Sequence, residues 1–190
     1  MSEKTQDILE AASRMFMRYG FTKTTMSDIA DEAGVARQTV YNAFPGKDEI
    51  LRGVVRTTGQ ATLTGVQSAW QDCTTLEQKI DIFHRLGPVA WFEIIRAAPD
   101  WGALLEGMHK SAAEEMAAME QEWIAAISLI LRPHLEQTPS APVSLHALAE
   151  FFYSGSLNAK YGAEDVDHLQ RRLRTVKYAI CALAARAHTN

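Results

Sequence analysis

Cysteine is scarce in this sequence of 190 residues: only Cys73 and Cys181 occur, and neither they nor the six histidines have metal-ligand spacing. This excludes a disulfide-stabilised scaffold and argues against a metal site. No apolar run is long enough to cross a bilayer, and the first residues lack the apolar core of a signal peptide. We therefore expect a cytoplasmic protein with no membrane partner.

Catalytic motifs are missing as well. The sequence contains no Gly-rich phosphate loop, no nucleophile elbow, no HExxH and no paired carboxylates in an evident cleft. The Ser154-Gly155-Ser156 segment is better explained by close packing of helices. We expect no enzyme and no cofactor.

Positive charge is not in excess either, since the formal net charge is −4. Residues 1–56 carry eight basic and eight acidic residues, while residues 57–190 carry eleven and fifteen and hold the whole excess. A neutral N-terminal part cannot bind DNA by bulk charge, so binding would need a local basic face and base readout. This favours a selective regulator over a packaging protein.

Apolar residues at helical spacing fill most of the chain, and no strand signal or internal repeat is present, so the predicted fold class is all-α. We expect a DNA-binding domain over residues 1–56 and a helical ligand-binding and dimerisation domain over residues 57–190. The predicted elements are helices at 5–19, from 47 past 70, from 76 with a kink at Gly87-Pro88, from 99 to 107 and from 109 to 131, a loop at 138–142, and two final helices.

Residues 24–47 have the pattern of two short helices at a tight turn. Thr25 and Asp28 form a capping box at the start of the first helix. Gly34 stands where the chain needs a left-handed residue, and Ala30 is small where two helices approach closely. This is the helix-turn-helix signature, in which the second helix enters the major groove. The alternative is an ordinary αα-hairpin with a Gly turn.

The N-terminal residues resemble the TetR family of transcriptional regulators. The resemblance covers the first 55 residues and rests on Tyr19-Gly20-Phe21, Thr24-Thr25, Ile29-Ala30, Ala33-Gly34-Val35, Thr39-Val40-Tyr41, Phe44, Lys47 and Leu51. Beyond these residues the likeness is one of architecture alone. It implies a homodimeric repressor on a palindromic operator of double-stranded DNA.

Residues 36–42 would then lie in the major groove. Arg37, Gln38 and Thr39 can hydrogen-bond base edges. The residues expected to hold phosphates are Thr24, Thr25, Tyr41, Asn42 and Lys47. Ala36 opens the second helix where the family often has Ser or Thr, so a cap and a phosphate contact are missing there.

The last two helices carry apolar stripes at steps of three and four residues. The members are Leu148, Phe152 and Gly155 on one helix and Leu169, Leu173, Val176, Ile180 and Leu183 on the other. The resemblance implies that they pair with a second subunit as a four-helix bundle. The alternative is that both stripes pack into the protomer's own core, because each helix has a second apolar face, with Phe151 and Leu157 on one and Tyr178, Ala182 and Ala185 on the other.

An effector site for a small apolar molecule is implied by the resemblance. The residues on the helices that would surround it are Trp91, Phe92, Trp101, Met108, Met116, Met119 and Trp123. Apolar walls with a few polar groups suit such a site, and Met adapts to variable ligands. Plain core packing is the alternative. His84 and His109 are either polar contacts in the site or ordinary surface and core residues.

These features predict a repressor that a small effector releases from its operator by shifting the helix from Lys47 to Trp70. A DNA-binding architectural or cell-division protein of the same fold, without an effector, is the second hypothesis.

Overall fold

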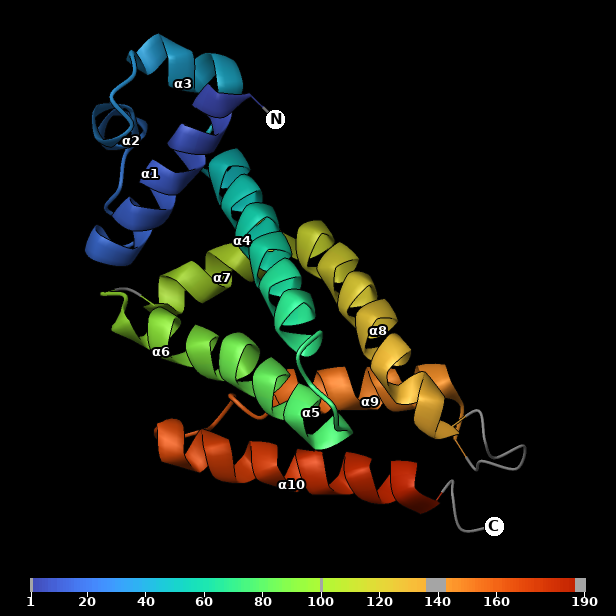
Figure 1. Cartoon of the computed structure of the whole chain (residues 1–190). Helices are drawn as coiled ribbons and strands as arrows, with labels where there is room; N and C mark the ends of the chain where they lie inside the picture. Colours follow the sequence, from blue (N-terminus) through green and yellow to red (C-terminus); the bar gives the residue numbers. More distant parts are fainter. Residues whose placement is uncertain (1, 100, 136–142, 187–190) are drawn as a thin grey trace. The chain divides into compact units, whose positions relative to one another are not determined.

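The computed structural model describes residues 2–99, 101–135 and 143–186, apart from the side chains of Trp101 and Arg186. Over these residues the chain is helical, without a strand, as predicted (Figure 1). The loop predicted at 138–142 lies outside the described residues. No described helix is both long and apolar enough for a membrane span.

The chain divides into two compact units. The first unit consists of the residues up to Gln60 together with Ile94–Met119, and the second consists of Ala61–Glu93 together with the residues from Glu120 on. Helices α1 (Glu3–Tyr19), α2 (Met26–Glu32), α3 (Arg37–Ala43) and α7 (Trp101–Ser111) belong to the first unit. Helices α5 (Leu76–His84), α9 (Leu145–Asn158) and α10 (Val166–Arg186) belong to the second. Three helices contribute residues to both: α4 (Lys47–Trp70), α6 (Ala90–Ala97) and α8 (Ala113–Leu135).

Helix α1 begins at a Ser cap and ends at a glycine. The Ser2 hydroxyl accepts from the Thr5 N–H, and Gly20 adopts φ 90° directly after the last turn. Such a positive φ favours glycine at a helix C-cap. Ile8 and Phe16 are buried on the inner face, whereas Tyr19 in the last turn is 45% exposed.

Helices α1, α4 and α7 pack tightly at two glycines. A Cβ atom at Gly53 would lie 2.6 Å from a δ-carbon of the buried Leu9. A Cβ atom at Gly107 would lie 3.2 Å from Leu51 and 3.3 Å from Phe21. Helix α7 therefore continues through Gly107 to Ser111, and the predicted helix end at Gly107 is wrong. A glycine is needed at this position because Leu51 and Phe21 approach the helix closely, and not because the helix ends there.

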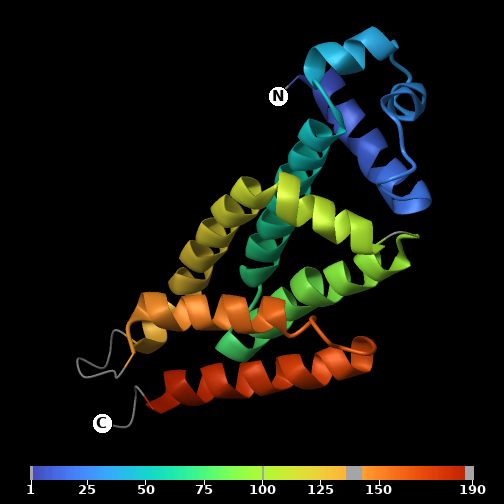
Figure 2. The ribbon, with the colours of Figure 1, turned by 180° about the vertical axis from the view of Figure 1, so that it is seen from behind.

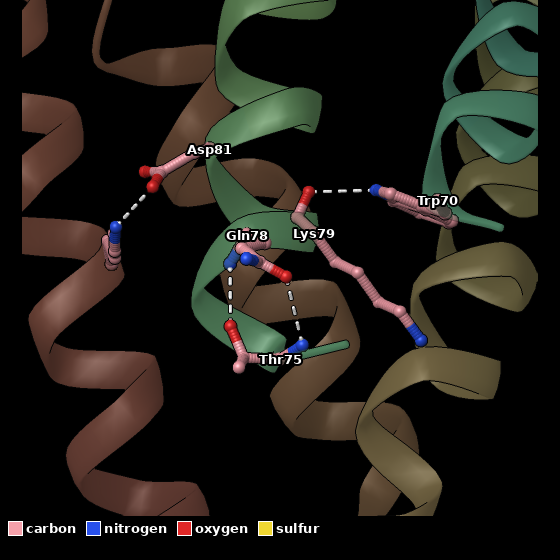
Figure 3. Close-up of polar contacts among 6 residues, drawn as sticks. Trp70, Thr75, Gln78, Lys79 and Asp81 are labelled. Carbon is pink, nitrogen blue, oxygen red and sulfur yellow. Dashed lines mark hydrogen bonds and ion pairs between the residues drawn. The ribbon is translucent and has the colours of Figure 1, made fainter. Parts of the chain in front are cut away.

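In the second unit, the turn between α4 and α5 is held by capping and by an indole hydrogen bond (Figure 3). Thr75 and Gln78 form a reciprocal capping box at the start of α5. The Trp70 indole N–H donates to the Lys79 carbonyl at 2.8 Å. Further along α5, Asp81 forms an ion pair with Lys177 of α10. Helix α5 begins at residue 76 as predicted, whereas α4 ends at Trp70 and does not run past it as predicted.

The chain passes Gly87-Pro88 as a π-helical turn. This element, η1 (Arg85–Val89), joins α5 directly to α6, and the Ala90 N–H donates to the Arg85 carbonyl five residues earlier. A proline removes one backbone donor and crowds the preceding turn, and the wider π turn accommodates it. Pro133 likewise lies inside α8, which begins at Ala113 and not at the predicted residue 109.

Helices α9 and α10 lie side by side (Figure 2). They approach where a Cβ atom at Gly155 would lie 3.8 Å from both γ-methyl groups of Val176. Arg172 donates to the carbonyls of Ala159 and Tyr161 and so satisfies backbone acceptors after α9.

Candidate nucleic-acid interface

The first helix of the helix-turn-helix is anchored by its capping box. The Asp28 backbone N–H donates to the Thr25 hydroxyl oxygen at 3.2 Å, and the Thr25 backbone N–H and hydroxyl both donate to the Asp28 carboxylate, at 2.8 and 2.7 Å. These hydrogen bonds with Thr25, aided by the charge of Arg37, hold the pKa of Asp28 below its ordinary value. The predicted capping box is confirmed.

The turn that follows sets the position of α3. Gly34 has φ 66°, the left-handed conformation predicted for it, and the Val35 N–H donates to the Ala30 carbonyl at 3.0 Å. Ala30 is fully buried, in agreement with the predicted close approach of two helices at this small residue. Val40 and Phe44 are buried and seat α3 against the first unit. The opposite side of α3 is left facing outward because Val40 and Phe44 lie four residues apart on one face.

That outward side carries a row of hydrogen-bonding side chains. Arg37, Gln38, Tyr41 and Asn42 are exposed, and Thr39 is half-buried. The Gln38 side-chain N–H donates to the Asn42 amide oxygen at 2.8 Å, so the two amides are aligned along the helix. Ala36 caps α3 without a side-chain hydrogen bond, as predicted. A guanidinium and two amides in one row can read base edges in a major groove.

Two residues predicted to hold phosphates have other partners in the structure. The Thr24 hydroxyl is buried and donates to the Gly20 carbonyl at 2.7 Å. The Lys47 ammonium donates to the carbonyls of Phe21, Thr22 and Thr24 at 2.6, 3.2 and 3.1 Å, and it lies 4.5 Å from the centre of the Phe21 ring. Its three protons are thereby used within the protein.

The predicted phosphate contacts through the side chains of Thr24 and Lys47 therefore do not fit this structure. Lys47 ties the loop between α1 and α2 to the start of α4. The Thr25 hydroxyl is exposed, but it already donates to Asp28. Tyr41 and Asn42 are exposed, and the Asn42 amide oxygen already accepts from Gln38. The sequence could not predict the Lys47 contact because its partners are backbone carbonyl groups, which every residue has.

The residues predicted to surround an effector fall in both units. In the second unit, Phe92 packs with Ala159, Leu169 and Leu173, and the ring of the buried Trp123 meets Phe83 edge-on at 5.1 Å. Phe92 and Trp123 are thus core residues in this structure. In the first unit, Met119 lies against Gly59, with its methyl group 3.1 Å from an added Cβ atom.

The remaining four of these residues stay predictions. Trp91, Met108 and Met116 are half-buried, and the side chain of Trp101 lies outside the described residues.

Most of the predicted dimer seam is buried within the single chain. The residues with no more than 2% exposure are Leu148, Phe152, Leu169, Leu173 and Ile180. Gly155, Val176 and Leu183 are half-buried. Side chains that are already covered have no surface to offer a second subunit, so the five buried residues correspond to the alternative of a protomer core. The second apolar face of these helices is the one that carries exposed aromatic residues, Phe151 and Tyr178.

Together, the capped α2, the left-handed turn and the exposed row on α3 define a helix-turn-helix DNA-binding protein. The family model described as "Bacterial regulatory proteins, tetR family" matches residues 8–54, which contain this whole unit. The N-terminal residues 8–54 of the chain therefore match the TetR family of transcriptional regulators.

Known proteins of this kind are similar to the chain either over a short stretch or at low identity. YfiR of Bacillus subtilis, an HTH-type transcriptional regulator, is 25% identical over 162 residues, which span 79% of this chain and 75% of YfiR. The transcriptional repressor KstR2 of Mycobacterium tuberculosis is 39% identical over 57 residues, 28% of each chain. The crystal structure of regulatory protein TetR from Rhodobacter sphaeroides has a TM-score of 0.68 at 18% identity and covers 93% of this chain and 98% of that one. This last likeness shows the fold.

Proposed function

We propose that the chain is a cytoplasmic, homodimeric repressor that binds a palindromic operator and is released from it by a small, largely apolar effector. The observation that carries the DNA-binding part is the exposed row of Arg37, Gln38, Tyr41 and Asn42 opposite the buried side of α3. The name of KstR2 as a repressor supports the direction of regulation. In this proposal, residues 1–56 form the DNA-binding domain and residues 57–190 form the domain that binds the effector and dimerises.

Specificity in this proposal comes from α3 and not from net charge. The acidic residues of the N-terminal part are partly neutralised locally, because Arg14 pairs with Glu32 and Arg52 pairs with Glu49, each at 2.8 Å. Exposed pairs of this kind contribute little to stability, but each one offsets an acidic charge that would repel DNA phosphates. Arg37 is then the residue best suited to a bidentate contact with guanine O6 and N7.

The test compares Arg37→Ala and Arg37→Lys on an operator obtained by in vitro selection and on a scrambled duplex. Arg37→Ala is expected to cost about 1–3 kcal/mol of binding free energy on the operator and much less on the scrambled duplex. Arg37→Lys keeps the charge but loses the planar fork, so it should retain nonspecific binding and lose discrimination. Equal weakening of both duplexes by Arg37→Ala would show that α3 is not the reading helix.

We place the dimer interface on the exposed faces of α9 and α10 that carry Phe151 and Tyr178, which are 51% and 71% exposed. A helix-turn-helix protein reads a palindrome through a two-fold axis, and an interface of this kind is enriched in aromatic residues. Phe151→Asp with Tyr178→Asp should give folded monomers in sedimentation at micromolar concentration.

The matched control for this double variant is Leu129→Asp, which changes an exposed apolar residue of α8 and should leave the dimer intact. Leu173→Asp should instead unfold the second unit, because it buries a charge in the protomer core. A Phe151/Tyr178 variant that stays dimeric would place the interface elsewhere.

A further inference from the structure

Two amide side chains on the outward side of α3 are hydrogen-bonded to each other. The Gln38 Nε2 atom donates to the Asn42 Oδ1 atom at 2.8 Å, and both side chains are exposed. Residues four apart on a helix lie one above the other on the same face. Gln38 lies about 200° around the helix from Val40, which is fully buried. The amide pair therefore stands on the side of α3 that would face the major groove.

This hydrogen bond decides which amide atoms of Gln38 remain for another partner. A glutamine amide has two N–H donors and one acceptor oxygen. The Asn42 oxygen accepts one of the N–H groups, so Gln38 turns its nitrogen toward Asn42. An exposed glutamine without such a partner can exchange the places of its oxygen and nitrogen by rotation. Gln38 instead presents one N–H donor and one acceptor oxygen, held in a single orientation.

One donor next to one acceptor is complementary to the major-groove edge of adenine. Adenine offers the N7 acceptor and the N6 amino donor, so it can accept from the Gln38 N–H and donate to the Gln38 oxygen. Guanine offers two acceptors, N7 and O6, and would place a lone pair against the Gln38 oxygen. Cytosine offers its amino donor alone, and thymine offers an acceptor and a methyl group. Adenine is the base that uses both groups.

We propose that Gln38 reads an adenine in each half-site of the operator, and that Asn42 is a positioning residue that orients the Gln38 amide. This inference rests on the proposed function as an operator-binding repressor, and it names the base that is read. It also replaces the phosphate contact that the sequence predicts for Asn42. Arg37, the preceding residue on α3, would read a guanine close to this adenine.

Stabilisation of α3 is the other effect that the amide pair could have. A side-chain hydrogen bond at this spacing favours helix formation by a factor of only about two. Helix α1 has a comparable pair, in which the Gln6 Nε2 atom donates to the Glu10 carboxylate at 2.9 Å. Gln6→Ala is therefore a matched control, because it removes the same kind of contact from another helix.

The first experiment identifies the base. In vitro selection of operators is carried out with the native protein and with Gln38→Ala, and the contacted adenine is the one that the native protein alone prefers. Changing this adenine to guanine in both half-sites, with the opposite strand changed to match, should weaken native binding by about 5- to 150-fold per site. Gln38→Ala should bind both duplexes equally. Selection of guanine at this position, or an adenine preference that survives in Gln38→Ala, would overturn the proposal.

Base analogues test the two hydrogen bonds on the native protein itself. 7-Deazaadenine lacks the N7 acceptor, and unsubstituted purine lacks the N6 amino donor. Either analogue at the contacted position should weaken native binding by about 2- to 12-fold per site, which corresponds to one hydrogen bond. Neither should affect Gln38→Ala. A native protein that binds all three duplexes equally does not read adenine through Gln38.

Variants of Asn42 separate positioning from phosphate binding. Asn42→Ala should reduce the discrimination between adenine and guanine by about 2- to 12-fold. Asn42→Asp keeps an acceptor for Gln38, so it should retain the discrimination while its charge weakens binding to every duplex. Gln6→Ala should change neither quantity. If Asn42→Ala weakens all duplexes equally and leaves the discrimination intact, Asn42 is a phosphate contact and the positioning role is wrong.

The guanine read by Arg37 distinguishes failure of this inference from failure of the proposed function. If the native protein selects an operator whose guanine preference is lost in Arg37→Ala, but no adenine depends on Gln38, the assignment of Gln38 and Asn42 alone is wrong. If the native protein selects no sequence at all, the repressor proposal falls with it.

Discussion

Replacing Lys47 with methionine tests whether this side chain stabilises the DNA-binding unit or binds DNA. The ammonium donates three hydrogen bonds, to the carbonyls of Phe21, Thr22 and Thr24, at distances of 2.6 to 3.2 Å. Methionine keeps an unbranched apolar side chain over the Phe21 ring and removes the charge and all three donors. The change therefore isolates the polar contacts of the residue.

The magnitude follows from the partners. A hydrogen bond that involves a charged group contributes about 1.5–3 kcal/mol, and three bonds to one ammonium do not add fully. The Thr22 carbonyl is exposed and can be hydrated after the change, whereas those of Phe21 and Thr24 are partly buried. The contact with the Phe21 ring adds about 0.5–1 kcal/mol. We expect a total loss of about 2–4 kcal/mol, or a melting temperature lower by about 5–10 °C.

Thermal unfolding followed by circular dichroism measures this loss, and DNA titrations well below the transition measure binding. Lys23→Met is the matched control, because Lys23 is an exposed lysine of the same loop. It should leave the melting temperature unchanged. The reasoning is refuted if Lys47→Met melts like the native protein and weakens operator and scrambled duplex equally, with a salt slope smaller by about one per subunit, since that is the behaviour of a phosphate contact.

For two other changes, the structure predicts whether the stability of the protein rises or falls. The pKa of His84 is lowered to about 4 in the folded protein, so the unfolded chain binds more protons between about pH 6.5 and 4. The free energy of unfolding should therefore fall by up to about 3 kcal/mol as the pH is lowered through this window. Denaturant titrations at several pH values measure this dependence, and His84→Phe should remove it. Gly53→Ala should destabilise the protein by about 1–2 kcal/mol because the new methyl group meets the buried Leu9, while Gly65→Ala, which meets nothing within 4 Å, should stabilise α4 by up to about 1 kcal/mol; equal melting temperatures for the two variants would contradict the close packing at Gly53.

Features that depend on a few neighbouring residues were predictable from the sequence. The capping boxes at Thr25 and Thr75 each close over three residues, and the positive φ at Gly20 and Gly34 is needed locally to end a helix or turn the chain. Because these signals are local, no knowledge of the packing was required.

Features that depend on distant parts of the chain were not predictable. The Lys47 ammonium reaches a carbonyl 26 residues earlier, and backbone carbonyls look alike in any sequence. Gly107 and Pro133 are residue types that often end helices, yet both lie inside helices. At Gly107 the close approach of Leu51 and Phe21 explains the glycine.

The sequence also could not predict which apolar side of α10 faces the protomer core. The helix is apolar on two sides, and spacing alone cannot decide which side is inward. Lys177 pairs with Asp81 of α5, and Leu173 and Ile180 are buried, so the packing of α5 and α9 against α10 decides the matter. The face with Tyr178 is left outside as a consequence.

The proposed effector must do more than occupy a site, because release from DNA requires unequal affinity for two states of the protein. Shifting an equilibrium from 99% DNA-competent to 99% DNA-incompetent takes about 5.5 kcal/mol, or roughly half of that at each of two sites in a dimer. A single neutral hydrogen bond to the effector supplies about 0.5–1.5 kcal/mol, so most of the difference has to come from apolar contact. At about 25 cal/mol per Å², the missing 1–2 kcal/mol per site corresponds to roughly 40–80 Å² of apolar surface covered in one state and exposed in the other. A single aromatic ring presents more apolar surface than this, so a small effector suffices to release the operator, provided that the DNA-incompetent state covers this surface and the DNA-competent state leaves it exposed.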